Sequence, residues 1–288
     1  MEYMQSSAIA TTFLPLALAV IMLGLGLSLK VSDFTRIVKF PKAVLVGLAC
    51  QMLLMPVICF FVAKSFALPP ELAVGLMLLS ASPGGAVANL YSHLSKGDVA
   101  LNVTLTAINS LLTLLTLPLI VNFSLEYFMQ EGQYIPMQFK KVIEVFFIVL
   151  IPVTIGMTIN KLFPRISQAL SKPVKIASAL LLASVIILAV SKDKENLGGF
   201  FLQIAPAALA FNVLSMMAGY FIPRLVNLSK REAIAIGMEI GIHNGTIAIY
   251  LALNVLANTM MAMPPAIYSL IMFFTAAAFG ALVNLKKE

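Results

Sequence analysis

The sequence predicts an all-α membrane protein with nine transmembrane helices, two of them broken, arranged as an inverted repeat. Three observations predict this fold class: the composition, the spacing of the apolar runs, and an interruption near the middle of two of those runs. Of the 288 residues, 60% are hydrophobic and only 11% are charged, whereas soluble domains carry about 25% charged residues. A surface so poor in charge has to face lipid over most of its area.

Apolar runs of about 20 residues are long enough to cross the hydrocarbon core as helices. Polar breaks divide the chain into nine such runs, and together they form one membrane domain over residues 1–288. The expected spans are Ile9–Leu29, Ala43–Ala63, Glu71–Ser95, Val99–Val121, Phe139–Leu162, Val174–Val190, Gly199–Ile222, Glu232–Leu256 and Pro265–Leu285. The segment Met1–Ser7 carries Glu2 and no Lys or Arg, unlike a cleavable signal, so the first run is expected to be a true span.

The basic residues orient these spans. Five of the 19 Lys and Arg residues follow even-numbered spans, and the other fourteen follow odd-numbered ones. The five are Lys64, Lys140, Lys141, Lys192 and Lys194. Because the Lys- and Arg-rich side of a membrane protein is cytoplasmic, the N-terminus is expected outside and the C-terminus inside. The basic residues then act as topology signals, and no nucleic-acid partner is expected.

Two spans are interrupted near their middle. The third contains Ser80-Ala-Ser-Pro-Gly-Gly85, and the eighth contains Glu239-Ile-Gly-Ile-His-Asn-Gly245. Proline and paired glycines break the helical hydrogen-bond ladder, and the freed backbone groups need partners within the membrane. A simple proline kink is the alternative for one span. Two breaks in halves of opposite orientation favour the binding site of an inverted-repeat transporter.

One carboxylate, Glu239, lies near the middle of an expected span, and no Lys or Arg lies at that depth. A charge there persists only with a partner or a function. The partner is a bound cation or a proton, and the alternative is a protonated, hydrogen-bonded glutamate. Oxygen-bearing side chains that suit a hard cation occur in the neighbouring spans. They include Gln51, Ser80, Ser82, Asn89, Asn102, Thr104, Thr106, Asn109, Ser110, Asn212, His243, Asn244 and Thr246.

Residues 102, 106 and 109 share one helix face, so the fourth span presents a polar stripe, whose alternative reading is helix–helix hydrogen bonding. The half-helices also present positive N-terminal ends at mid-membrane, where they favour an anionic substrate.

No phosphate-binding loop, zinc motif or nucleophile elbow is present, so no enzyme is expected. A channel lacks the repeated pore loop. The residues therefore indicate a cation-coupled carrier of a small organic anion, with no cofactor and no obligate protein partner.

Several stretches resemble the bacterial branch of the bile acid:sodium symporter family. They are Met22-Leu-Gly-Leu-Gly-Leu-Ser-Leu-Lys30 with Asp33-Phe34, Pro41-Lys42, Gln51 with Pro56, Pro83-Gly-Gly-Ala-Val-Ala-Asn89, Lys96-Gly-Asp-Val-Ala-Leu101, and Glu239-Ile-Gly-Ile-His-Asn-Gly245. The resemblance runs from about residue 14 to the end. It implies a nine-span form with a panel bundle (about 9–29 and 139–190) and a core bundle (about 43–121 and 199–285).

The resemblance also implies sodium as the coupling ion and two sodium sites. The first would fall on Asn89, Asn102, Thr106 and Glu239. The second would fall on Gln51, Glu239, Ile240, Ile242 and His243, the isoleucines acting through their carbonyl oxygens. Asn244 stands where the family contacts substrate, and Gly84, Gly85 and Asn212 are the other residues expected near the substrate.

Three positions depart from the family pattern. Ala88 and Asn102 stand where serines are usual, and His243 stands where the family has glutamine. Because histidine titrates near neutral pH, a proton on His243 is an alternative to the second sodium ion.

The expected function is sodium-coupled symport of an organic anion, either bile acid-like, pantoate-like or a small keto acid. The expected location is a bacterial inner membrane. Proton coupling or efflux on the same fold and a non-transporting membrane sensor are the alternatives.

Overall fold

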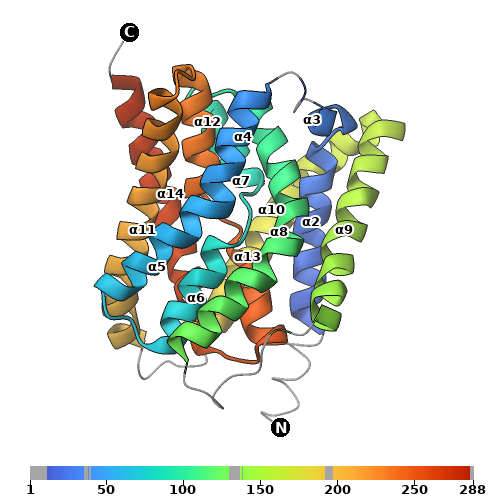
Figure 1. Ribbon diagram of the computed structural model, residues 1–288. Coiled ribbons are helices and arrows are strands. Elements are labelled where there is room, and N and C mark those ends of the chain that lie inside the picture. The colour runs from blue at the N-terminus through green and yellow to red at the C-terminus, as the bar shows by residue number, and fades with distance from the viewer. Residues whose placement is uncertain are drawn as a thin grey trace.

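The computed structural model describes residues 12–35, 38, 40–129, 137, 139–191 and 197–285, and it confirms the all-α fold class (Figure 1). The helices are α2 (Leu14–Ser28), α3 (Val31–Thr35), α4 (Pro41–Ala49), η3 (Cys50–Leu54), α5 (Met55–Ser65), α6 (Pro70–Ser80), α7 (Ala86–Leu94), α8 (Val99–Phe128), α9 (Phe139–Leu162), α10 (Pro164–Ser191), α11 (Leu197–Leu225), α12 (Lys230–Gly241), α13 (Gly245–Tyr250), η5 (Leu251–Val255), η6 (Met260–Ala262) and α14 (Met263–Leu285).

The helices have the lengths and composition of an integral membrane protein. Among the described residues, five helical runs are long and apolar enough to cross a bilayer, and three shorter apolar helices accompany them. Helix α2 begins at the bottom of the bundle in Figure 1 and α14 ends at its top. The count of nine spans and their orientation stay predictions, and the expected start of the first span at Ile9 lies outside the described residues.

Several helices run further than the apolar runs predicted. Helix α8 continues through Pro118 to Phe128, and α10 begins at Pro164 and passes through Pro173. Proline does not end these helices because neighbouring helices in a membrane can supply partners for the freed backbone groups. Two π-helical turns, η3 and η5, were not predicted. Such turns are frequent at functional sites, and η3 contains Gln51.

Helix α2 packs most extensively against α9 and α10, on the right of the bundle in Figure 1. These three helices contain the residues expected for the panel, and the division into panel and core stays a proposal. Gly26 faces the backbone of Val153 on α9, while the Gly24 position faces the side chains of Val174 and Ser178 on α10. The glycines of α2 therefore serve close helix packing.

We expect Gly26→Ala to destabilise the protein, because its Cβ would clash with the Val153 backbone. Overpacking of this kind costs about 1–3 kcal/mol in the free energy of unfolding. Gly24→Ala is the matched control, since an added Cβ would lie 3.0 Å from Val174 Cγ1, an atom of a side chain that can rotate away. Thermal unfolding in detergent measures both variants. Equal melting temperatures for Gly26→Ala and wild type would contradict this packing.

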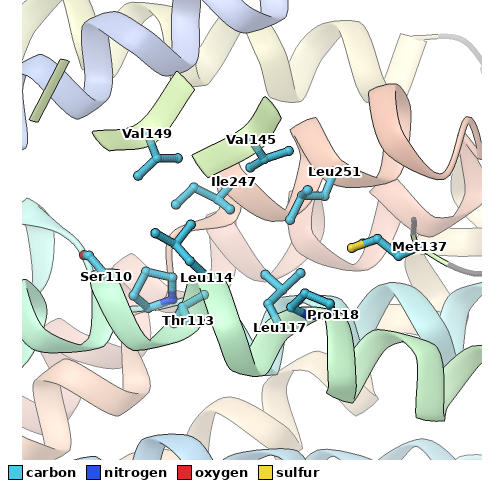
Figure 2. Close-up of a pocket in the computed structure, with 11 residues that line it drawn as sticks. Ser110, Thr113, Leu114, Leu117, Pro118, Met137, Val145, Val149, Ile247 and Leu251 are labelled. Atoms are coloured by element: carbon cyan, nitrogen blue, oxygen red, sulfur yellow. The ribbon is translucent and has the colours of Figure 1, made fainter. Parts of the chain in front are cut away.

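A small cavity lies where α8 and α13 face α9 (Figure 2). Its volume is about 20 Å³, room for about one water molecule. Its walls are mostly apolar and come from Leu114 and Leu117 of α8, Val145 and Val149 of α9, and Ile247 of α13. Pro83, from the first helix break, also lines it.

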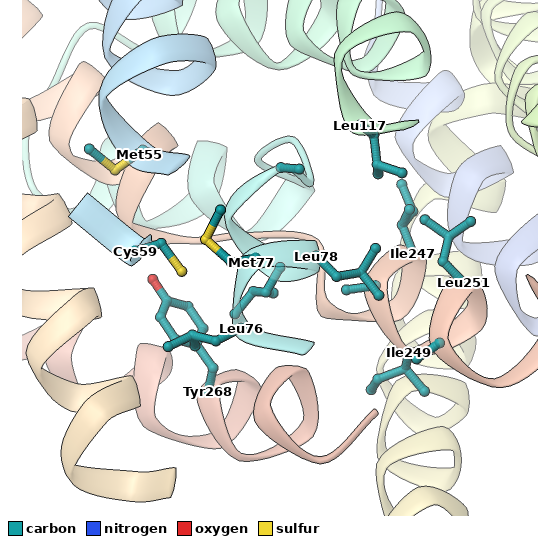
Figure 3. Packing of buried hydrophobic residues seen from close by; sticks show 14 of the residues in the cluster. Met55, Cys59, Leu76, Met77, Leu78, Leu117, Ile247, Ile249, Leu251 and Tyr268 are labelled. Atoms are coloured by element: carbon teal, nitrogen blue, oxygen red, sulfur yellow. The ribbon is translucent and has the colours of Figure 1, made fainter. Parts of the chain in front are cut away.

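Large, buried apolar side chains form a hydrophobic cluster around the two helix breaks. Leu76, Met77 and Leu78 on α6 are buried, as are Ile247 and Ile249 on α13 (Figure 3). Tyr268 of α14 is fully buried in the same cluster, and its hydroxyl points towards Cys59 of α5. Polar atoms at the breaks are thereby shielded from lipid, as a binding site within a membrane requires.

Candidate cation site at the helix crossing

The interruptions predicted in the third and eighth spans are present, and the two breaks meet. Helix α6 ends at Ser80 and α7 begins at Ala86, while α12 ends at Gly241 and α13 begins at Gly245. The backbone N–H of Asn244 donates to the Pro83 carbonyl oxygen at 2.8 Å, and Gly84 pairs with His243 in an isolated antiparallel bridge. Each break thus supplies hydrogen-bond partners for the other, which extended backbone at this depth requires.

Glu239 lies on the last turn of α12 and is fully buried. Its Oε2 accepts a hydrogen bond from Thr106 Oγ1 at 2.6 Å, and its Oε1 accepts one from Asn109 Nδ2 at 3.1 Å. The backbone of Gly84 hydrogen-bonds the same carboxyl group. No ion pair joins Glu239 to a Lys or Arg among the described residues. Hydrogen bonds orient the carboxyl group, and its negative charge at this depth is balanced by a bound cation or removed by a proton.

The backbone at Gly84 passes directly against this carboxylate. A Cβ added at Gly84 would lie 2.5 Å from the carboxyl carbon and from both oxygens of Glu239. A Cβ added at neighbouring Gly85 would meet nothing within 4 Å. Glycine at 84 is therefore required by a close approach between the first break and Glu239.

Amide oxygens around the crossing have no hydrogen-bond partner among the described residues. They belong to Gln51, Asn89, Asn102, Asn109 and Asn212. In four of the five residues, the nitrogen of the same amide group donates a hydrogen bond to a neighbouring oxygen. Gln51 donates to the Ser80 and Ser82 carbonyls, Asn102 to the Ala235 carbonyl, Asn109 to the Glu239 carboxylate, and Asn212 to the Gly241 carbonyl and the Tyr268 hydroxyl.

These bonds fix which end of each amide is oxygen, because a carbonyl cannot donate. The crossing is consequently rich in buried acceptors that lack donors. A buried acceptor without a partner is costly, and a hard cation such as sodium satisfies several acceptors together. The residues present therefore fit a sodium ion beside Glu239.

His243 also packs against the first break. Its Nδ1 lies 3.1 Å from the Ser82 carbonyl oxygen, which also accepts from Gln51. In the neutral ring Nδ1 therefore carries the hydrogen, and Nε2 presents a lone pair that has no partner among the described residues. Phe211 stacks on the ring, with centroids 5.6 Å apart and planes at 11°, and Tyr268 lies against it at 5.6 Å. The imidazole is thus a further buried acceptor.

The structure brings several of the predicted site residues together. Thr106 contacts Glu239 directly, Asn102 lies one turn earlier on α8, and Gln51 shares the Ser82 carbonyl with His243. Ile240 and Ile242 lie at the end of α12, where their carbonyls leave the helix.

The residues predicted to lie near the substrate occupy different places in the structure. Asn244 Oδ1 caps α13 by accepting from Ile247 N at 3.3 Å, beside the open position at Gly85. Asn212 is fully buried behind the second break and holds the Gly241 carbonyl. Asn212 therefore supports the break from the interior.

Two residues of the site were not assigned to a sodium or substrate site from the sequence, although Asn109 was among the oxygen donors named there. Asn109 contacts Glu239, and its place on the polar stripe of the fourth span was the available signal. The hydroxyl of Tyr268 donates to the Gly241 carbonyl at 2.9 Å. A tyrosine in the last apolar run carries no local signal for this bond, because it depends on how α14 packs against the second break.

Comparison with known proteins identifies the family of the chain. The sequence model of the sodium bile acid symporter family matches residues 15–200 of this chain. The chain is 28% identical to an uncharacterized sodium-dependent transporter, YocS, of Bacillus subtilis, over 90% of this chain and 79% of that protein. It is 27% identical to a probable chloroplastic sodium/metabolite cotransporter of Arabidopsis thaliana, over 88% of this chain and 62% of that protein. It is 25% identical to the ileal sodium/bile acid cotransporter of Oryctolagus cuniculus, over 98% of this chain and 82% of that protein. The chain belongs to the sodium bile acid symporter family.

Proposed function

We propose that this protein is a sodium-coupled carrier that moves a small organic anion across the membrane by alternating access. The observation that carries the proposal is the set of buried acceptors around Glu239, which face no donor and no basic side chain among the described residues. A site of this composition binds a cation and rejects an anion. Sodium beside Glu239 would neutralise the carboxylate and satisfy the unpartnered amide oxygens.

The anion is proposed to bind next to the first break rather than at Glu239. Helix α7 starts at Ala86, directly after Gly85, so its positive end faces this region. Gly85 has open space at the position of a Cβ, and Asn244 lies nearby across the bridge between the breaks. The Asn244 oxygen is used to cap α13, so its amide N–H groups are the part that can face a carboxylate or sulfate.

Coupling follows from the contact between the two breaks. Gly84 touches Glu239, and Asn244 hydrogen-bonds Pro83. Sodium bound beside Glu239 would fix both breaks in the arrangement that forms the anion site. Alternating access would then be a movement of α2, α9 and α10 against the remaining helices. This movement would separate the side chains of α9 from those of α8 and α13, which meet around the small cavity.

The names of two relatives support the proposed substrate class. They describe transport of bile acid in one case and of a metabolite in another, each with sodium. The chain spans 62% of the Arabidopsis protein, so the activity of that whole protein comes to this chain only as a proposal. A small organic anion, of the bile acid, pantoate or keto acid type, suits both relatives. We propose a bacterial inner membrane with the N-terminus outside as its location.

A thermal-shift screen of organic anions tests this function. A ligand that binds the folded state raises its stability by about 2.7 kcal/mol at one hundred times its dissociation constant. We expect a bound anion to raise the melting temperature in sodium chloride but much less in potassium chloride at the same ionic strength. An anion that stabilises the protein equally in both salts would contradict sodium coupling.

A further inference from the structure

The carbonyl oxygen of Gly241, the last residue of α12, is held by donors from two other helices. Asn212 Nδ2 of α11 donates to it at 2.8 Å, and the hydroxyl of Tyr268 of α14 donates to it at 2.9 Å. Asn212 Nδ2 also donates to the Tyr268 hydroxyl oxygen at 2.8 Å. A side-chain amide has two N–H donors and a tyrosine has one O–H, so these bonds use every donor of the two side chains. The three groups therefore form a closed triangle.

The triangle fixes the peptide group that ends α12. The carbonyl of Gly241 belongs to the same peptide group as the N–H of Ile242, which donates to the Met238 carbonyl at 3.1 Å. Because a peptide group is planar, bonds at both of its ends fix the direction in which the chain leaves the helix. Carbonyls at a helix end have no partner within the helix, and one donor would satisfy this one. Two donors from different helices also hold its direction.

Helix α14 contacts both edges of the second break. Tyr268 holds Gly241 at the end of α12. The next residue, Ser269, lies so close to Gly245 at the start of α13 that a Cβ added there would clash with the Ser269 hydroxyl. The buried ring of Tyr268 also lies against His243, with centroids 5.6 Å apart. The shape of the second break thus depends on α14 as well as on the first break.

The fixed peptide closes the helical turn that carries Glu239. The bond from the Ile242 N–H to the Met238 carbonyl spans this turn, and Glu239 and Ile240 lie within it. Hydrogen bonds from α8 hold the carboxyl group on its other side. The ligands of a bound ion need support from the groups behind them, because small displacements weaken binding. A shift at the end of α12 would move the carboxylate relative to the acceptors of α8.

We propose that Tyr268 is a positioning residue for sodium binding, which acts with Asn212 to hold the end of α12 so that Glu239 faces the ion. The inference rests on the proposed sodium coupling and adds a residue of α14 to it. Tyr268 acts through the backbone, because its hydrogen is used on the Gly241 carbonyl. Sodium affinity should therefore depend on a hydroxyl that does not touch the ion.

Equilibrium binding of radioactive sodium to purified full-length protein in detergent tests this role. Tyr268→Phe keeps the ring and removes the hydroxyl, and Asn212→Leu removes the other donor at similar size. Tyr91→Phe is the matched control, because the Tyr91 hydroxyl of α7 donates to the Phe273 carbonyl of the same helix α14 at 3.0 Å. Three quantities are measured for each protein: the sodium affinity, the amount of sodium bound at saturation, and the melting temperature without sodium.

We expect Tyr268→Phe to bind sodium about ten-fold more weakly, the effect of removing a group that supports the ligands of a bound ion. The amount bound at saturation should equal that of wild type, because the ligands themselves are unchanged. Asn212→Leu should weaken binding in the same direction. Tyr91→Phe should keep the wild-type sodium affinity, although its melting temperature should fall about as much as that of Tyr268→Phe, since each loses one hydrogen bond to a backbone carbonyl.

Wild-type sodium affinity in Tyr268→Phe or in Asn212→Leu would overturn the inference, because the triangle would then only satisfy the Gly241 carbonyl. Equal weakening in Tyr91→Phe and Tyr268→Phe would also overturn it, since the loss would come from a general loosening of α14. Less sodium bound at saturation with unchanged affinity would show an effect on folding alone. These results leave the proposed function intact, whereas a wild-type protein that binds no sodium would overturn both.

Discussion

Glu239→Gln is expected to abolish sodium-dependent uptake in a protein that still folds and inserts. Gln keeps the size of the side chain and an oxygen that can accept from Thr106 or Asn109, so the packing around residue 239 survives. The negative charge, however, is lost from a site with no other ionised side chain in contact among the described residues. Removing one partner from a buried charge pair costs 2–5 kcal/mol, which corresponds to about 30-fold or more in sodium affinity.

Uptake of a labelled substrate anion into vesicles, driven by an inward sodium gradient, measures this effect. Glu144→Gln is the matched control, because Glu144 is half exposed on α9 and pairs with Lys141 at 3.1 Å. That control should transport like wild type. Retained uptake with wild-type sodium dependence in Glu239→Gln would refute the role of the carboxylate.

Gly84→Ala is expected to have the second large effect. The added Cβ would lie 2.5 Å from the carboxyl group of Glu239, so either the first break or α12 has to shift. A shift of the carboxylate breaks its bonds to Thr106 and Asn109 and moves it away from the amide oxygens. Sodium should then no longer stabilise the protein against thermal unfolding.

Gly85→Ala provides the comparison for this variant. Its Cβ would meet nothing within 4 Å, and its backbone is extended. Sodium should raise the melting temperature of Gly85→Ala as it does that of wild type. Equal sodium stabilisation of Gly84→Ala and Gly85→Ala would contradict the close contact between the first break and Glu239.

The sequence predicted the features that local chemistry determines. Proline and paired glycines at 83–85 end a helix wherever they lie, so the first break could be placed within a few residues. Glu144 follows Lys141 by three positions, a spacing at which helical side chains meet, and the structure pairs the two at 3.1 Å.

Features that depend on how distant helices pack were not predictable in the same way. Glycine at 84 was predicted to break the helix and to lie near the substrate, whereas the structure places it directly against the Glu239 carboxylate, 155 positions away. The roles of Asn109 and Tyr268 depend on the rotation of α8 and α14 about their own axes.

Equilibrium binding of radioactive sodium to purified wild-type protein and to Glu239→Gln, measured side by side in choline chloride, tests the central claim most directly. The claim is that a sodium ion binds at the helix crossing and that its charge is balanced by Glu239. It predicts saturable binding to wild type that unlabelled sodium displaces and equimolar potassium does not, together with loss of this binding in Glu239→Gln. Saturable binding of equal affinity to both proteins would contradict the claim.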